Sequence, residues 1–123
     1  MSSDISRLPP QVQERLLRLQ QLQQTLQSVM AQKQQVDAEQ SEVDQTLAEL
    51  QKTVDDAVIY KAIGSLLVKS DKTKVTAELT ERKELLTTRT TVLTRQEERL
   101  RTQVKEVQTK LQEDLNPVAP PSP

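Results

Sequence analysis

The stretch Val58-Ile-Tyr-Lys-Ala-Ile-Gly-Ser-Leu-Leu-Val-Lys-Ser70 is the one dense apolar run in an otherwise polar sequence. Its β-branched residues, such as Val58 and Ile59, favour strands over helix. Gly64 is the single glycine of the chain and stands mid-run, where a tight reversal needs a residue that tolerates positive φ. The stretch therefore predicts a β-hairpin, with strands over about 58–62 and 65–70.

The predicted hairpin is apolar on both of its faces. Successive residues of a strand point to opposite faces, yet Val58 and Ile59 are both apolar, as are Leu66 and Leu67. A strand of this kind is normally buried on both faces, and an isolated hairpin is only marginally stable in water. No other segment of the chain reads as a strand, so we expect the partner strands to be hairpins of other subunits.

Apolar residues at heptad spacing flank the hairpin on both sides, which is typical of a coiled coil. They predict one helix over about 11–57, beginning near Pro9 and Pro10, and a second over about 71–115, capped by Ser70 or Asp71. The first seam consists of Val12, Leu19, Leu26, Lys33, Gln40, Leu47 and Val54, with Arg15, Leu22, Val29, Val36, Val43, Leu50 and Ala57. The second consists of Leu79, Leu86, Leu93, Leu100 and Val107, with Lys83, Thr90, Glu97, Val104 and Leu111.

Two helices of similar length joined by a reversing hairpin are expected to pair antiparallel. Charge agrees, because residues 1–57 carry 9 acidic and 5 basic side chains and residues 58–123 carry 9 acidic and 12 basic ones. The expected fold class is all-α dominated: a long antiparallel two-helix coiled coil with one central β-hairpin. We expect a single domain over 1–123, with a disordered Pro-rich tail over 116–123.

The composition argues against several classes of function. The 123 residues include no Cys and no His, which removes the usual metal ligands, nucleophile and general base. One Gly is too few for a phosphate-binding loop, so we expect no enzyme, no metal and no cofactor. A net charge of −1 disfavours nucleic acid as a partner. No apolar run approaches the roughly 20 residues of a membrane span, so we expect a cytoplasmic protein without a membrane partner.

The order helix, VIYKAIGSLLVKSDKTKV, helix resembles the β-type subunits of archaeal prefoldin over about residues 8–115. The resemblance implies a hexamer of two α-type and four β-type chains, in which the hairpins build an intersubunit β-barrel. It also implies an ATP-independent holdase that captures unfolded polypeptides and passes them to a group II chaperonin.

The same resemblance implies two sets of functional residues. The subunit-assembly residues on the hairpin are Val58, Tyr60, Ile63, Leu66, Leu67 and Val68. The client-binding residues at the ends of the helices are Val12, Leu16, Leu19, Leu22, Val104, Val107, Leu111 and Leu115. Residues at heptad spacing are more often coiled-coil core, so this second assignment competes with a purely structural role.

A second function stays open on the sequence alone. A structural coiled-coil scaffold or tether would have the same helices but would need neither exposed helix ends nor a central β assembly. The two functions differ in whether the chain suppresses the aggregation of a denatured protein without nucleotide.

Overall fold

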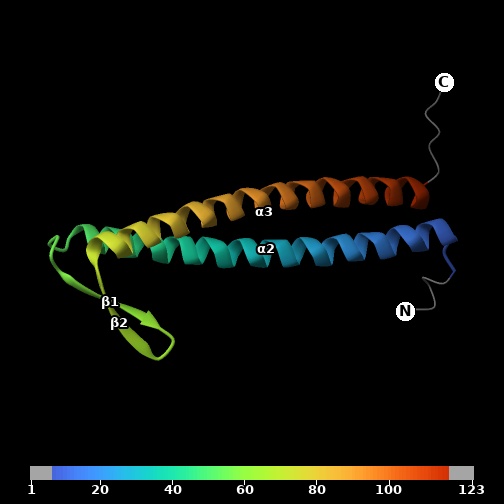
Figure 1. Cartoon of the computed structure of the whole chain (residues 1–123). Coiled ribbons are helices and arrows are strands. Elements are labelled where there is room, and N and C mark those ends of the chain that lie inside the picture. Colours follow the sequence, from blue (N-terminus) through green and yellow to red (C-terminus); the bar gives the residue numbers. More distant parts are fainter. Residues whose placement is uncertain (1–6, 117–123) are drawn as a thin grey trace, which may run out of the picture. The chain divides into compact units, whose positions relative to one another are not determined.

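The computed structural model of the chain describes residues 7–116 and has four elements. They are α2 (Pro10–Gln51), β1 (Val58–Ile63), β2 (Leu66–Asp71) and α3 (Lys72–Leu115) (Figure 1). The predicted fold class is confirmed: two long helices dominate, and one antiparallel hairpin connects them. The barrel of that fold class forms between subunits, so one chain contains only its own hairpin. All of the predicted tail except Asn116 lies outside the described residues.

Helix α2 begins where the two prolines predict. The carbonyl of Pro9 accepts hydrogen bonds from the backbone N–H groups of Val12 (3.0 Å) and Gln13 (3.1 Å). Pro10 occupies the first helical position, where its missing N–H would have had no intrahelical partner.

The predicted end of this helix at residue 57 is wrong, because α2 ends at Gln51. The N–H of Thr53 bonds to the Leu50 carbonyl at 3.1 Å, a spacing tighter than that of the α-helix, and its Oγ1 donates to the same oxygen at 2.7 Å. The β-branched Thr53 and Val54 are weak helix formers, and Asp55 and Asp56 would lie at the negative end of the helix dipole. These local effects outweigh the heptad pattern.

The hairpin turns at Gly64 and Ser65, so β1 extends one residue beyond its predicted end at 62. Strand β2 begins and ends one residue later than the predicted 65–70, because Ser65 belongs to the turn. Antiparallel pairing runs from Val58 opposite Asp71 to Ile63 opposite Leu66. Gly64 has φ +58° and no other described residue has positive φ. A two-residue turn with positive φ at its first position only is the type II′ turn, which favours Gly at this position.

Helix α3 begins immediately after β2. Asp71 Oδ1 accepts the backbone N–H of Lys74 at 2.8 Å, which confirms the predicted cap. The ammonium of Lys72 reaches back to the chain that follows α2, 2.8 Å from the Thr53 carbonyl and 3.4 Å from Asp55 Oδ1. A cation at that position compensates the carbonyl end of α2.

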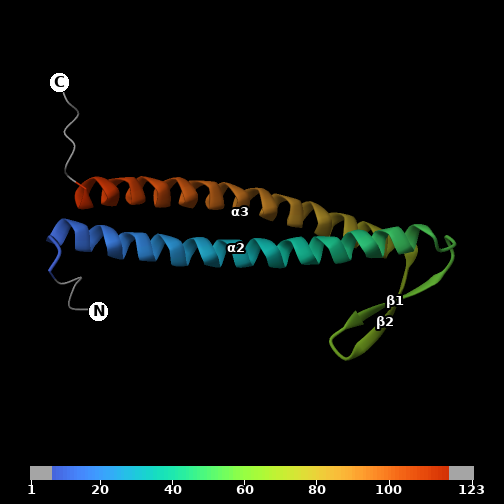
Figure 2. The same ribbon diagram turned by 180° about the vertical axis from the view of Figure 1, so that it is seen from behind.

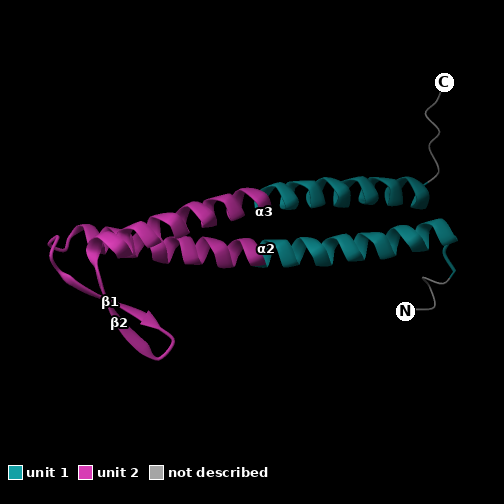
Figure 3. Ribbon diagram, in the orientation of Figure 1, with its two compact units in different colours: residues 1–31, 93–123 teal, residues 32–92 magenta. Residues whose placement is uncertain are grey.

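The chain divides into unit 1, Met1–Ala31 with Leu93–Pro123, and unit 2, Gln32–Val92 (Figure 3). Within each unit, a part of α2 packs antiparallel to a part of α3. The buried seam of unit 1 consists of Val12, Leu22, Val29, Leu93 and Leu111. The buried seam of unit 2 consists of Val36, Val43, Leu50, Val75 and Leu86. Nearly all of these residues are at predicted heptad positions, and the single-domain organisation stays a prediction.

Polar contacts cross the seam of unit 2. Gln40 Nε2 donates to Thr87 Oγ1 at 3.2 Å, and the Lys83 ammonium lies 2.9 Å from the Asp44 carboxylate. Gln40 is a polar residue of the first seam, and a specific polar partner at such a position favours one register of the helix pair.

Candidate interaction surfaces

The hairpin presents the largest concentration of exposed apolar side chains in the described part of the chain. Its six predicted assembly residues are between 42% and 73% exposed. They are Val58, Tyr60, Ile63, Leu66, Leu67 and Val68. Apolar groups gathered at this density on a surface mark a site that another molecule covers.

The strand register divides these residues between two faces. Residues directly opposite one another share a face, so Val58, Tyr60 and Leu67 lie on one face. Ile63, Leu66 and Val68 lie on the other. The prediction of a hairpin that is apolar on both faces is therefore confirmed. The sheet has only two strands in the described residues, so each strand has one edge free to pair with a further strand.

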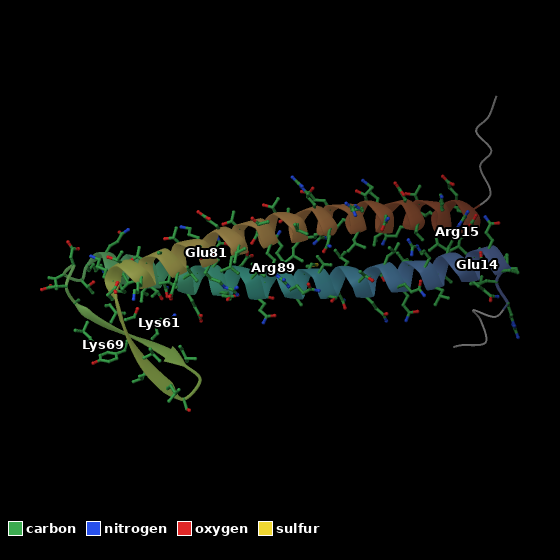
Figure 4. The ribbon with its side chains drawn as sticks, in the orientation of Figure 1. Glu14, Arg15, Lys61, Lys69, Glu81 and Arg89 are labelled. Carbon is green, nitrogen blue, oxygen red and sulfur yellow. The ribbon has the colours of Figure 1, made fainter. Side chains whose placement is uncertain are left out.

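One ion pair ties the hairpin to α3 within unit 2. The Lys61 ammonium lies 2.6 Å from the Glu78 carboxylate, and Lys61 is half-buried. Figure 4 marks Lys61 and Lys69 on the two strands, and Figure 2 shows the hairpin from behind. The ion pair connects the turn-proximal half of β1 to α3, and the apolar residues next to the turn, Ile63 and Leu66, stay exposed.

The ends of α2 and α3 meet in unit 1, at a terminal end that we define as residues 10–22 and 104–115. The Arg15 guanidinium forms a salt bridge with Asp114, and it also donates to the Lys110 carbonyl at 3.4 Å (Figure 4). The side chains of Arg15 and Asp114 are 26% and 20% exposed, so this pair is screened less than a fully exposed one. The structure thus places the N-terminal turns of α2 beside the C-terminal turns of α3.

The predicted client-binding residues of the terminal end differ in burial. Val12, Leu22 and Leu111 are buried in the seam of the helix pair, whereas Leu115 is exposed. The half-buried ones are Leu16, Leu19, Val104 and Val107. The structure brings all eight together at one end of unit 1, and their role in binding stays a prediction.

Sequence reasoning missed three exposed apolar residues on the helices. Leu17 is 56% exposed in unit 1, and Leu85 and Val92 are exposed on α3 of unit 2. All three lie outside the heptad seam, and Leu85 and Val92 are seven residues apart, so they share one flank of α3. The seven-residue spacing of Leu85 and Val92 could have been recognised in the sequence as a second apolar stripe outside the seam.

Within residues 7–116, no group of three or more acidic side chains could hold a metal ion. No described helix combines the length and the apolar character that crossing a bilayer requires.

One exposed apolar hairpin between two paired helices defines a class of protein, the helix-pair subunits that carry a single β-hairpin. The model of the family described as "Prefoldin subunit" matches residues 13–117. The chain belongs to the prefoldin subunit family, whose members are chaperone proteins.

Proteins similar to this chain in sequence include β-type subunits. The chain is 50% identical to prefoldin subunit beta of Archaeoglobus fulgidus, over 91% of this chain and 97% of the relative. It is 42% identical to prefoldin subunit beta of Methanothrix thermoacetophila, over 92% of this chain and 94% of the relative. The crystal structure of the prefoldin beta subunit from Thermococcus strain KS-1 is similar with a TM-score of 0.81 and 43% identity, covering 94% of this chain and 98% of that chain. The predicted resemblance is confirmed.

Proposed function

We propose that this chain is the β-type subunit of a hetero-oligomeric prefoldin, in which its hairpin joins an intersubunit β-barrel with hairpins of α-type and β-type subunits. The observation that carries this proposal is the exposed hairpin, whose apolar residues on two faces require cover from other chains. Its partner is an α-type subunit, and the assembly contains two α-type and four β-type chains.

The assembled protein acts as an ATP-independent holdase in the cytoplasm. It captures unfolded polypeptides at the terminal end of each helix pair and passes them to a group II chaperonin. Leu115 and the half-buried Leu16, Leu19, Val104 and Val107 support this role, because they widen the seam into an apolar stripe. Fraying of the helix ends would add the buried Val12, Leu22 and Leu111 to the stripe.

One terminal end would bind a client only weakly. Each captured apolar side chain contributes at most roughly 1.5–3 kcal/mol, and ordering a flexible client offsets part of that. Several subunits that hold one client chain raise the effective concentration for each further contact. Affinity therefore depends on the assembly that the hairpin provides.

The experiment removes residues 1–22 together with 105–123, which are matched ends of the antiparallel helices in unit 1. The truncated chain is expected to assemble with its α-type partner, because the hairpin is intact, and to lose suppression of the aggregation of a denatured test protein. A chain that lacks only residues 117–123 is the control and should suppress aggregation normally. Both measurements are made with and without ATP and Mg²⁺, and nucleotide should change neither.

A scaffold or tether remains the competing function, and the buried seams would serve it equally well. It predicts that the intact assembly does not suppress aggregation at any stoichiometry. If a truncated but fully assembled complex suppresses aggregation as well as the intact one does, the client site lies outside the terminal ends.

A further inference from the structure

A groove runs between α2 and α3 in unit 2, away from the hairpin strands. It has a volume of about 550 Å³. Its floor includes the buried Val36 and Leu86, and Leu85 forms an exposed apolar wall. The polar residues that line it are Gln32, Gln35, Glu39, Arg82, Thr88 and Arg89.

The charged side chain of the groove lining that is left to pair with a ligand is positive. Glu39, its one acidic lining residue, is paired with Arg82, whose Nε lies 3.0 Å from the Glu39 carboxylate. Arg89 is exposed, and none of the ion pairs among residues 7–116 involves it (Figure 4). Once the Glu39–Arg82 pair is counted as neutral, the remaining charge of the groove is the guanidinium of Arg89.

The sequence around the lining residues reinforces this bias. No Asp or Glu occurs between Glu14 and Asp37 on α2, or between Glu84 and Glu97 on α3. From Asp37 to Glu49, α2 carries five acidic residues and no basic one, and of these only Glu39 lines the groove. Among the residues that line the groove, a carboxylate from another molecule thus meets one cation, Arg89, and no unpaired acid.

We propose that this groove is a second polypeptide-binding site that takes an acidic, apolar segment of an unfolded chain. An apolar side chain of that segment covers Leu85, and a neighbouring carboxylate pairs with the guanidinium of Arg89 in a charge-assisted hydrogen bond. The amide group of Gln35 is within the same groove and can bond the backbone of an extended segment. The Thr88 hydroxyl, which donates to the Glu84 carbonyl at 3.2 Å, can accept a hydrogen bond from that backbone. This inference rests on the proposed capture of unfolded polypeptide and adds the charge of the segment that is captured.

The test uses the assembled complex of the full-length chain with its α-type partner. The probes are fluorescein-labelled peptides of alternating leucine and glutamate, and matched peptides with glutamine or lysine in place of glutamate. Fluorescence anisotropy at low ionic strength gives the affinities, because salt screens an exposed ion pair. We expect the glutamate peptide to bind most tightly and the lysine peptide least tightly.

Two variants locate the site. Arg89→Gln removes the cation without changing helix propensity much, and it should weaken the glutamate peptide about two- to fivefold while leaving the glutamine peptide unchanged. Arg95→Gln makes the same charge change at an exposed residue of α3 that does not line the groove, and is the control. Leu85→Gln should weaken the glutamate and glutamine peptides alike, by about threefold or more.

The outcomes are distinct. Equal affinities for the glutamate and lysine peptides, or equal effects of the Arg89 and Arg95 variants, would overturn the proposal. A change in the mass of the complex caused by Arg89→Gln would also overturn it, because the groove would then be a contact between subunits. Loss of aggregation suppression on truncation of the terminal ends tests the proposed function separately, and either result can occur without the other.

Discussion

Replacing Ile63 and Val68 together by lysine tests whether the hairpin assembles the oligomer. The two side chains lie on the same face of the hairpin and are 53% and 42% exposed in the isolated chain. Full burial of such side chains contributes about 1.5–3 kcal/mol each, so covering the exposed half of both contributes about 1.5–3 kcal/mol per subunit. Each lysine in a buried sheet adds a penalty of several kcal/mol.

Together these effects weaken assembly by at least about 5 kcal/mol per subunit, which is more than a thousandfold in the dissociation constant. The isolated subunit should change little, because exposed substitutions usually alter stability by about 0.5 kcal/mol or less. Native mass spectrometry and circular dichroism are therefore expected to show dissociated subunits with their helical content retained. The double variant Leu85→Lys and Val92→Lys adds the same charge to exposed residues of α3 and should assemble normally. A double hairpin variant with the wild-type mass would refute the reasoning.

Three further changes test local features. Gly64→Ala should lower the free energy of unfolding, measured by chemical denaturation, by about 1–2 kcal/mol, because Gly64 has φ +58°. Nothing within 4 Å would contact the added Cβ, so Gly64→Asn, whose side chain tolerates positive φ better, should lower it less. Thr90→Val should raise the free energy of unfolding by about 1 kcal/mol, because Thr90 Oγ1 is buried without a hydrogen-bond partner among the described residues, whereas Thr91→Val should not. Lys72→Met should lower the melting temperature of the helix pair, and Lys74→Met should leave it nearly unchanged, because the Lys72 ammonium bonds the Thr53 carbonyl; equal melting temperatures would contradict this role.

The helices could be predicted because the heptad pattern repeats over many turns. The hairpin could be predicted because its turn residue, Gly64, is unique in the chain. The heptad places an apolar residue at Leu22, Val29, Val36 and Val43, and all four are buried. Gly64 is the one glycine, so the reversal had one place to occur. Repetition over many turns averages out local exceptions, which explains why the existence of α2 was easier to predict than its end.

The end of α2 depended on chemistry that the heptad does not contain. Val54 continues the heptad and yet is exposed in the turn after the helix. The carbonyl of Leu50 accepts a hydrogen bond from Thr53 Oγ1, and the Thr53 carbonyl accepts one from the ammonium of Lys72, which lies beyond the hairpin. A contact between residues so distant in sequence is invisible to a pattern read along one helix.

At the terminal end, the burial of each apolar residue depends on how the two helices pack against each other, and the spacing of residues in the sequence does not specify this. Val12 and Leu111 are both at heptad positions, and the structure buries both. Neither Leu16 nor Leu17 is at a predicted seam position, yet Leu16 is half-buried and Leu17 is exposed. Which apolar residues remain open depends on the rotation of each helix about its axis, and that is set by the partner helix.

The antiparallel pairing of the helices has a consequence for how the chain folds. Arg82 and Glu39 of unit 2 are 43 residues apart, whereas Arg15 and Asp114 of unit 1 are 99 apart. Closing the longer loop costs about 0.7 kcal/mol more in chain entropy. Contacts near the hairpin are therefore expected to form first, and pairing of the helices is expected to extend from there toward the two termini. During synthesis, the first half of α2 leaves the ribosome long before its partner exists, so its apolar seam stays exposed until the last turns of α3 have been made.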